Sequence, residues 1–167
     1  MFDSYDWYAI PHNRFNTGSA HTIANQFATI PGIARVELYG SISRDGVGND
    51  IDILLVVDDE KTYINFVSEV LHQVNAHETS KEHSGAQYRA RAVEHIFGKN
   101  MGIIRERMHV IPDDTGSNPY LYLDMFVVPW DWRSRLDELQ GHLPHDDPKF
   151  MKNVARDAWV IAVNPDP

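Results

Sequence analysis

The sequence contains no cysteine, and this absence removes several kinds of chemistry from consideration. Disulfide bonds, zinc–thiolate centres and thiol nucleophiles all require cysteine, so none of them is expected. Long apolar runs are also missing. No stretch approaches the roughly 20 residues that cross a bilayer, and the first residues lack a basic and apolar leader pattern. We therefore expect a cytoplasmic protein without a membrane partner.

Positive charge is scarce as well. The 167 residues include 24 Asp and Glu against 15 Lys and Arg, which gives a formal net charge of −9. The longest basic cluster, Arg89 and Arg91 followed by Arg105 and Arg107, is interrupted by other residues. Broad binding to nucleic acid needs basic surface that displaces counterions, so it is not expected. A small molecule or a protein is the favoured substrate, and an anionic one stays compatible because a bound metal ion inverts the local charge.

The nine histidines raise the alternative of a zinc site. No pair of these histidines belongs to a compact ligand set, so a zinc site is not expected. The sequence also lacks the glycine-lysine-serine or glycine-lysine-threonine element of a Walker-type phosphate loop.

The length and the composition, 43% hydrophobic and 23% charged, fit one globular domain. Apolar periodicity predicts helices over residues 19–30, from 58–60 through 74, and 87–97, and strands over 33–39, 50–57, 108–111 and 120–128. Thr17 or Ser19 is expected to cap the first helix. The C-terminal tail shows short helical patterns, best seen in Phe150, Val154, Ala158 and Ile161. This mixture of elements predicts an α+β or α/β sandwich rather than a bundle or a barrel.

The most unusual stretch is residues 38–57, LYGSISRDGVGNDIDILLVV. Strand geometry places Asp50 and Asp52 on the same face of one strand, about 7 Å apart. Like charges held this close repel each other, and burial of either carboxylate without a partner is costly. A divalent cation removes both problems, and Mg²⁺ favours a few carboxylates together with water and phosphate oxygens. The pair therefore predicts a metal site, against the alternative of a tight turn followed by a strand with polar edge residues.

Two further features extend this prediction. Asp124 is the only charged residue in the run 120–129, YLYLDMFVVP, and could join the pair as a third carboxylate. Carboxylates on neighbouring strands can hold two metal ions of the kind that clamp the oxygens in phosphoryl transfer. Gly40 lets the backbone turn sharply at a strand end, and the amides that follow it, with the Ser41 hydroxyl, can donate to phosphate oxygens.

These residues together resemble the signature of the DNA polymerase beta nucleotidyltransferase superfamily, and in particular its minimal (MNT-type) nucleotidyltransferases. The motif consists of Gly40 and Ser41, a spacer over residues 42–49, Asp50 and Asp52 around Ile51, and the later Asp124. Arg44 also matches an arginine that is frequent in that group, although an exposed loop arginine is the common alternative. The resemblance covers about residues 19–129 and is specific only in 38–57 and around Asp124. Two positions depart from the pattern: Asn49 replaces a common serine, and Asp45 precedes the loop glycine.

The resemblance implies an α+β fold with a polymerase-beta-like core, in which a mixed sheet has helices packed mainly on one face. It implies one domain over residues 1–167, with the core at about 19–129 and a C-terminal helical extension over 130–167. Aminoglycoside-type transferases share this core, but they usually carry a larger C-terminal substrate domain than 130–167 allows.

The resemblance also implies roles for the site residues. Asp50, Asp52 and Asp124 would be catalytic and would bind Mg²⁺ or Mn²⁺, and Asp124 would help to deprotonate the attacking hydroxyl. Gly40, Ser41 and Arg44 would bind the triphosphate of an NTP, for which ATP is the first expectation. A hydroxyl of a small molecule or a protein would attack the α-phosphate, so that a nucleoside monophosphate (AMP, if ATP is the donor) is transferred and pyrophosphate leaves.

Proteins similar to the MNT group often pair with a helical HEPN-type toxin and act as its antitoxin. A HEPN-type partner is therefore a hypothesis that follows from the resemblance alone. The competing hypothesis is a binding module, in which a nucleotidyltransferase fold binds a partner protein or a nucleotide without turnover.

Overall fold

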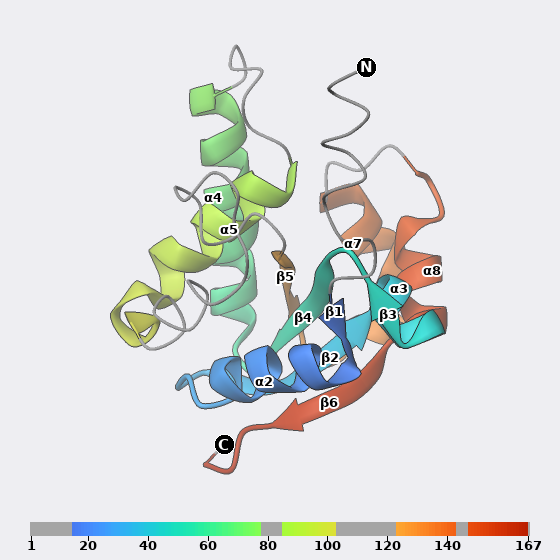
Figure 1. The fold of residues 1–167 in the computed structure, drawn as a ribbon. Coiled ribbons are helices and arrows are strands. Elements are labelled where there is room, and N and C mark those ends of the chain that lie inside the picture. The colour runs from blue at the N-terminus through green and yellow to red at the C-terminus, as the bar shows by residue number, and fades with distance from the viewer. Residues whose placement is uncertain (1–14, 78–84, 103–122, 143–146, 167) are drawn as a thin grey trace, which may run out of the picture.

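The structure is a computed structural model that describes residues 15–77, 85–102, 123–142 and 147–166. Its centre is a four-stranded mixed sheet with the strand order β5-β4-β2-β6 (Figure 1). The four strands are β2 (Ile33–Tyr39), β4 (Ile51–Val57), β5 (Leu123–Pro129) and β6 (Trp159–Val163). β4 runs antiparallel to β2 and parallel to β5, and β6 pairs antiparallel with the other edge of β2. A separate short pair joins β1 (Phe15–Asn16) to β3 (Val47–Gly48).

The described helices surround this sheet. They are α2 (Thr17–Phe27), α3 (Gly40–Asp45), α4 (Glu60–His77), α5 (Gly85–Phe97), α7 (Leu136–His142) and α8 (Phe150–Asp157), with short 3-10 turns η1 (Gly98–Asn100) and η2 (Trp132–Ser134). The predicted α+β class and mixed sheet are confirmed. The predicted strand over 108–111 lies outside the described residues. None of the described helices combines the length and the apolar character that a membrane crossing requires.

Helix α2 begins differently from the prediction. Its N-cap is Asn16 rather than Thr17 or Ser19. The Asn16 side-chain oxygen accepts a hydrogen bond from the Ser19 backbone N–H at 3.0 Å, and the Ser19 hydroxyl accepts one from the Asn16 backbone N–H at 3.3 Å. This reciprocal pair satisfies two backbone donors that a helix start otherwise leaves free. The helix therefore starts where β1 ends, two residues earlier than predicted.

The strand register divides the sheet into two unlike faces. On one face Tyr39, Asp52 and Asp124 lie side by side across three strands. The opposite face is apolar, and its central row contains Leu38 and Ile53, both fully buried. Alternation along a strand produces this separation, because successive side chains point to opposite faces. We call the first surface the acidic face.

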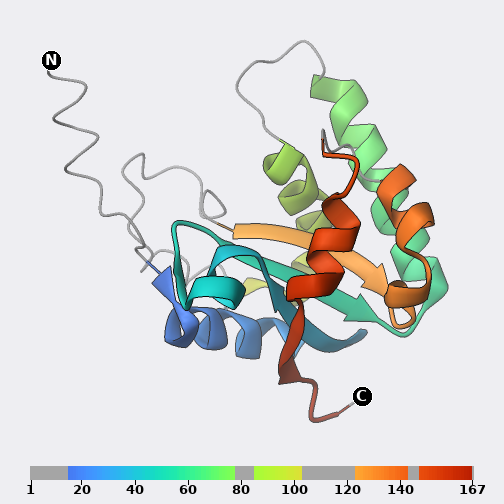
Figure 2. The ribbon, with the colours of Figure 1, turned by 90° about the vertical axis from the view of Figure 1, so that its right-hand side faces the viewer.

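Helices cover both faces of the sheet (Figure 2). On the acidic face the ring of Phe150, from α8, lies 6.2 Å from the Tyr39 ring and 5.4 Å from the Phe126 ring. On the apolar face the ring of His21, from α2, lies 6.1 Å from that of Trp159. Arg89 of α5 also lies over the Phe126 ring, so α5 and α8 share the acidic face, whereas α2 lies on the apolar face. The packing of helices mainly on one face stays a prediction.

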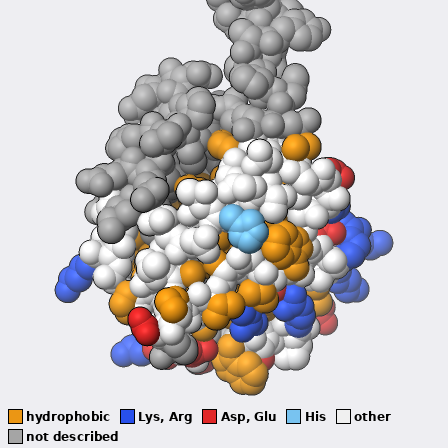
Figure 3. All heavy atoms as spheres, turned by 60° about the horizontal axis from the view of Figure 1, so that its bottom comes forward, with side chains coloured by type: hydrophobic (Ala, Val, Ile, Leu, Met, Phe, Trp, Pro, Cys, Tyr) orange, Lys and Arg blue, Asp and Glu red, His pale blue; other side chains and the backbone are white. Residues whose placement is uncertain are grey.

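The C-terminal segment ends in a strand that the sequence did not predict. Helix α8 confirms the helical pattern from Phe150 onward, but Ala158 leaves the helix with an extended backbone. Ile161 then lies in β6, so its assignment to a helix was wrong. Strand β6 is an edge of the sheet and exposes Trp159, Val160 and Val163. Hydrophobic side chains are exposed on the underside of the molecule, where α2 and β6 lie (Figure 3).

A fully buried carboxylate joins the C-terminal segment to the sheet. Glu37, in the middle of β2, accepts hydrogen bonds from Trp132 Nε1 at 3.0 Å, Arg133 Nη2 at 2.7 Å and Arg35 Nε at 3.0 Å. Burial raises the pKa of Glu37, but the hydrogen bonds from Arg133, Trp132 and Arg35 outweigh it, and the net pKa is lowered. The charge is therefore kept inside the fold because every oxygen has a donor.

Substitution of Glu37 by Gln is expected to lower the free energy of unfolding by about 3 kcal/mol, because it removes a buried charge that Trp132, Arg133 and Arg35 share. Urea denaturation measures this loss. Glu138→Gln is the matched control, since Glu138 also pairs with arginine but is 42% exposed, and its loss should stay below about 1 kcal/mol. Equal losses in the two variants would contradict this account of Glu37.

Candidate carboxylate site

The candidate site forms where three strands reach the same end of the sheet. β2 ends at Tyr39 and the chain turns at Gly40 into α3, while β4 begins just beside this turn. The register pairs Tyr39 with Asp52 on β4, and Asp52 with Asp124 on the parallel β5. Paired positions on neighbouring strands point to the same face, so the two aspartates face the same space. The structure thus brings two of the predicted carboxylates together from strands that lie far apart in the sequence.

Gly40 sits against the carboxylate of Asp52. Its backbone has φ +79°, a left-handed conformation that residues with a side chain rarely adopt. A β-carbon built at this position would lie 2.2 Å from Asp52 Oδ2, well inside contact distance. Glycine is therefore required at this turn for two independent reasons, and its backbone packs directly on one of the predicted metal ligands.

The ionised form of Asp52 is disfavoured by its surroundings. Burial, together with the nearby charges of Asp124 and Asp50, raises the pKa of the Asp52 carboxyl to about 8, while Arg44 and Arg89 oppose the shift. Asp50 itself is exposed and lies immediately before β4. Asp50 and Asp124 are therefore close enough to Asp52 to disfavour its ionised form. An added positive charge at this place would lower the cost of ionising Asp52.

Asp124 already has a cationic partner that the sequence analysis missed. Arg89, on α5, donates from Nε at 3.1 Å and from Nη2 at 2.9 Å, both to Asp124 Oδ1. The Arg89 side chain is only 5% exposed, and its Cζ lies 4.3 Å from the centre of the Phe126 ring. A sequence signal existed, because Arg89 falls four and eight residues before Val93 and Phe97, on the apolar stripe of its helix. A charge on such a stripe indicates a buried partner.

Tyr39 is a second residue of the site that the sequence analysis passed over. Its hydroxyl is buried and has no hydrogen-bond partner within the described residues. Burial raises the pKa of Tyr39 well above its ordinary value, and the charges of Asp124 and Asp52 raise it further, so the phenol stays protonated. A buried donor without an acceptor is costly, and in native proteins it commonly marks a place for water or an ion.

The remaining predicted residues lie on α3. Ser41 is half-buried in the first turn, and Arg44 is in the last turn of this helix. Arg44 Nη1 contacts Asp157 Oδ2 at 3.0 Å, and the Ser43 hydroxyl donates to the backbone oxygen of Asp157. Arg44 therefore ties α3 to the end of α8 while its charge still acts on Asp52. Its contact with a phosphate stays a prediction.

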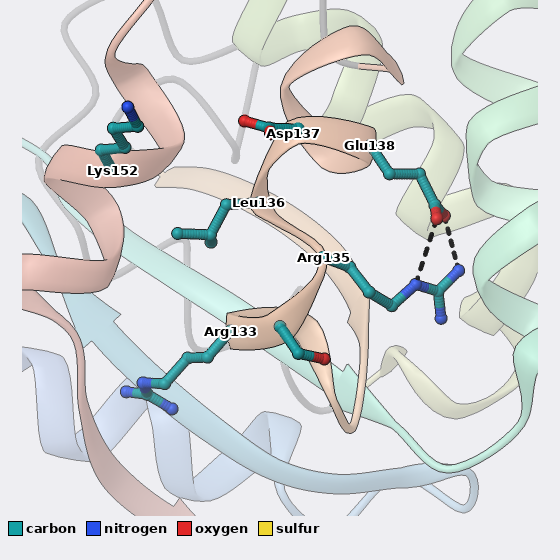
Figure 4. A pocket seen from close by; sticks show the side chains of 7 residues that line it. Arg133, Arg135, Leu136, Asp137, Glu138 and Lys152 are labelled. Atoms are coloured by element: carbon teal, nitrogen blue, oxygen red, sulfur yellow. Dashed lines mark hydrogen bonds and ion pairs between the residues drawn. The ribbon is translucent and has the colours of Figure 1, made fainter.

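As they stand, the side chains do not form a finished metal cage. Within the part of the chain that the structure describes, no group of three or more His, Asp or Glu side chains converges closely enough to hold a metal ion. The donor set nevertheless suits Mg²⁺ or Mn²⁺, because carboxylate oxygens predominate and the unpartnered Tyr39 hydroxyl could donate to a metal-bound water. A hollow of about 460 Å³ lies elsewhere, lined by Arg133, Arg135, Leu136 and Lys152 among others, and contains none of the predicted site residues (Figure 4).

Replacement of Gly40 by Ala is expected to displace the Asp52 carboxylate. The Gly46→Ala variant is the matched control, because Gly46 has φ +80° but its β-carbon would meet no atom within 4 Å in the described structure. The left-handed backbone alone should cost about 1 kcal/mol in either variant, and the contact with Asp52 should add at least about 1 kcal/mol for Gly40→Ala. Equal unfolding free energies of the two variants in urea would show that Gly40 does not pack on Asp52.

The raised pKa of Asp52 also predicts how stability depends on pH in the presence of EDTA. Between its ordinary value of 3.8 and about 8, the folded chain keeps a proton on Asp52 that the unfolded chain releases. The free energy of unfolding contributed by this group therefore falls as pH rises through that window. Asp52→Asn should be more stable than the wild type at pH 8, by on the order of a few kcal/mol, and the gap should close toward pH 4.

Thermal and urea denaturation at pH 5, 6.5 and 8 measure this effect. Asp45→Asn, an exposed aspartate of α3, controls for the general effect of removing one negative charge. A stability difference between wild type and Asp52→Asn that does not change with pH would contradict the shift.

Three contacts define the candidate site: Gly40 packs against Asp52, Asp52 lies beside Asp124, and Arg89 forms an ion pair with Asp124. No protein-family model, no curated protein and no solved structure matches the chain.

Proposed function

We propose that the protein is a metal-dependent nucleotidyltransferase with a polymerase-beta-like core. The observation that carries this proposal is the pairing of Asp52 with Asp124 across parallel strands, directly beside the Gly40 turn. Acid side chains at neighbouring strand ends, next to a turn that offers backbone amides, suit the binding of a metal–triphosphate complex.

The order of elements supports the same proposal. The chain passes from α2 through β2, the Gly40–Ser41 turn and the short helix α3 into the aspartate-bearing strand β4, and later reaches β5 with its single aspartate. The motif residues of the nucleotidyltransferase resemblance thus fall at the ends of adjacent strands. A tight turn with polar edge residues does not explain why Asp52 lies partly buried beside Asp124, where its own pKa is raised.

Asp50, Asp52 and Asp124 would hold the Mg²⁺ or Mn²⁺. When bound, the ion supplies positive charge that stabilises the phosphate oxygens during transfer. The unfavourable ionisation of Asp52 supports this role, because a carboxylate that is costly to charge alone is relieved by a cation.

The chain's own groups have separate tasks in this proposal. The Gly40–Ser41 turn and Arg44 would orient the triphosphate of ATP, and Asp124 would take the proton from the attacking hydroxyl. That hydroxyl would attack the α-phosphate, forming a new ester bond and releasing pyrophosphate. Positioning and charge, rather than covalent catalysis, would supply the acceleration.

The acceptor hydroxyl would belong to a small molecule or to a protein, and the acidic chain favours neither RNA nor DNA. A HEPN-type protein is the partner that the family resemblance suggests. The protein acceptor and the toxin–antitoxin role belong to the proposal through that resemblance alone.

The proposed activity is tested by the binding of ATP with Mn²⁺, measured by calorimetry, and by transfer of label from α-labelled ATP to candidate acceptors. Asp52→Asn and Asp50→Asn should each lower the transfer rate by about 100-fold or more, since each removes charge that acts on the transition state. Asp45→Asn, on the exposed side of α3, should leave the rate within about twofold of wild type.

Absence of metal-dependent ATP binding by the wild type would contradict the proposal. Stoichiometric capture of a partner protein by both the wild type and Asp52→Asn, without transfer of label by either, would favour the binding-module alternative instead.

A further inference from the structure

We propose that Arg89 is the positioning residue of the site: it holds one oxygen of Asp124 and leaves the other available to a bound metal ion. The inference rests on the proposed function and assigns a role to a residue outside the motif. It starts from the ion pair between α5 and β5.

The geometry of the pair is one-sided. Arg89 Nε and Nη2 both donate to the same atom, Asp124 Oδ1, at 3.1 and 2.9 Å. Two charged donors that converge on one oxygen hold that oxygen in place more firmly than a single contact does. Within the described structure no group donates a hydrogen bond to Asp124 Oδ2. The second oxygen of Asp124 therefore remains a candidate ligand while the first is held.

Arg89 is fixed in place by its surroundings. Its side chain is 5% exposed, and its guanidinium lies over the Phe126 ring. Gly85 leaves it room, because a β-carbon there would lie 3.0 Å from Arg89 Nη1. If Arg89 released Asp124 when a metal bound, a buried cation would lose its partner, which is strongly unfavourable. We therefore expect Arg89 to keep its contact with Asp124 when a metal ion binds.

The position of Asp124 makes such a hold necessary. Its side chain is 24% exposed and is the register neighbour of Asp52. Without Arg89, the Asp124 carboxylate would be free to turn away from the site toward solvent. Partners that orient metal ligands typically change metal affinity by 10- to 100-fold when removed. Arg89 is such an orienting partner for Asp124.

The test is the affinity for Mn²⁺ alone, measured by electron paramagnetic resonance of the free ion. Arg89→Met should weaken binding by about 10- to 100-fold. Arg89→Lys, which keeps the charge but loses the two-donor edge, should weaken Mn²⁺ binding by about tenfold or more. If Arg89→Met does not fold, the Arg89→Lys variant is the one that tests the proposal. Arg91→Met, an exposed arginine two residues along α5, should bind Mn²⁺ as the wild type does.

A double-mutant cycle separates positioning from a general structural effect. If Arg89 acts through Asp124, the Arg89→Met/Asp124→Asn variant should bind Mn²⁺ no more weakly than Asp124→Asn. Wild-type affinity in folded Arg89→Met and Arg89→Lys, or fully additive losses in the double variant, would overturn the inference while leaving the proposed function intact. Lack of Mn²⁺ binding by the wild type would overturn both.

Discussion

The structure depends on one electrostatic constraint: negative charges are gathered at the end of a largely buried sheet. Asp52 lies between Tyr39 and Asp124 in the strand register, with Asp50 just before its strand. Burial and the neighbouring carboxylates both disfavour its ionised form. A carboxylate shifted in this way is a candidate for a functional site, and a divalent cation is the ligand that would lower this cost most directly.

The rest of the acidic face is arranged around this charge. Gly40 lets the backbone approach the Asp52 carboxylate, Arg89 neutralises Asp124 from the side of α5, and Phe150 closes the aromatic surface over Tyr39. A second buried carboxylate, Glu37, differs because its charge is fully compensated by hydrogen-bond donors. It has a donor for each oxygen and is stable without any ligand. Glu37 thus keeps its charge inside the fold, whereas the ionised form of Asp52 is disfavoured, and this difference is why Asp52 rather than Glu37 is the proposed metal ligand.

Much of this site is predictable from sequence because strongly apolar strands determine where their side chains lie. The apolar runs that form β2, β4 and β5 are enough to place Gly40, Asp52 and Asp124 at the ends of strands. Arg89 and Tyr39 were missed because their roles arise from contacts between elements distant in sequence. Strand β6 was missed because five residues that directly follow a helix carry too little periodicity to distinguish a strand from a continued helix. Its pairing with β2 is what makes this segment a strand.

The central claim is that Asp52 resists ionisation until a cation is present, and the most direct measurement is its own titration. Carbon-13 NMR of the Asp52 carboxyl, with and without Mg²⁺, reports that protonation equilibrium residue by residue. The account predicts a pKa of about 8 in EDTA and a marked fall when Mg²⁺ is added. An ordinary aspartate pKa in EDTA that Mg²⁺ leaves unchanged would contradict it.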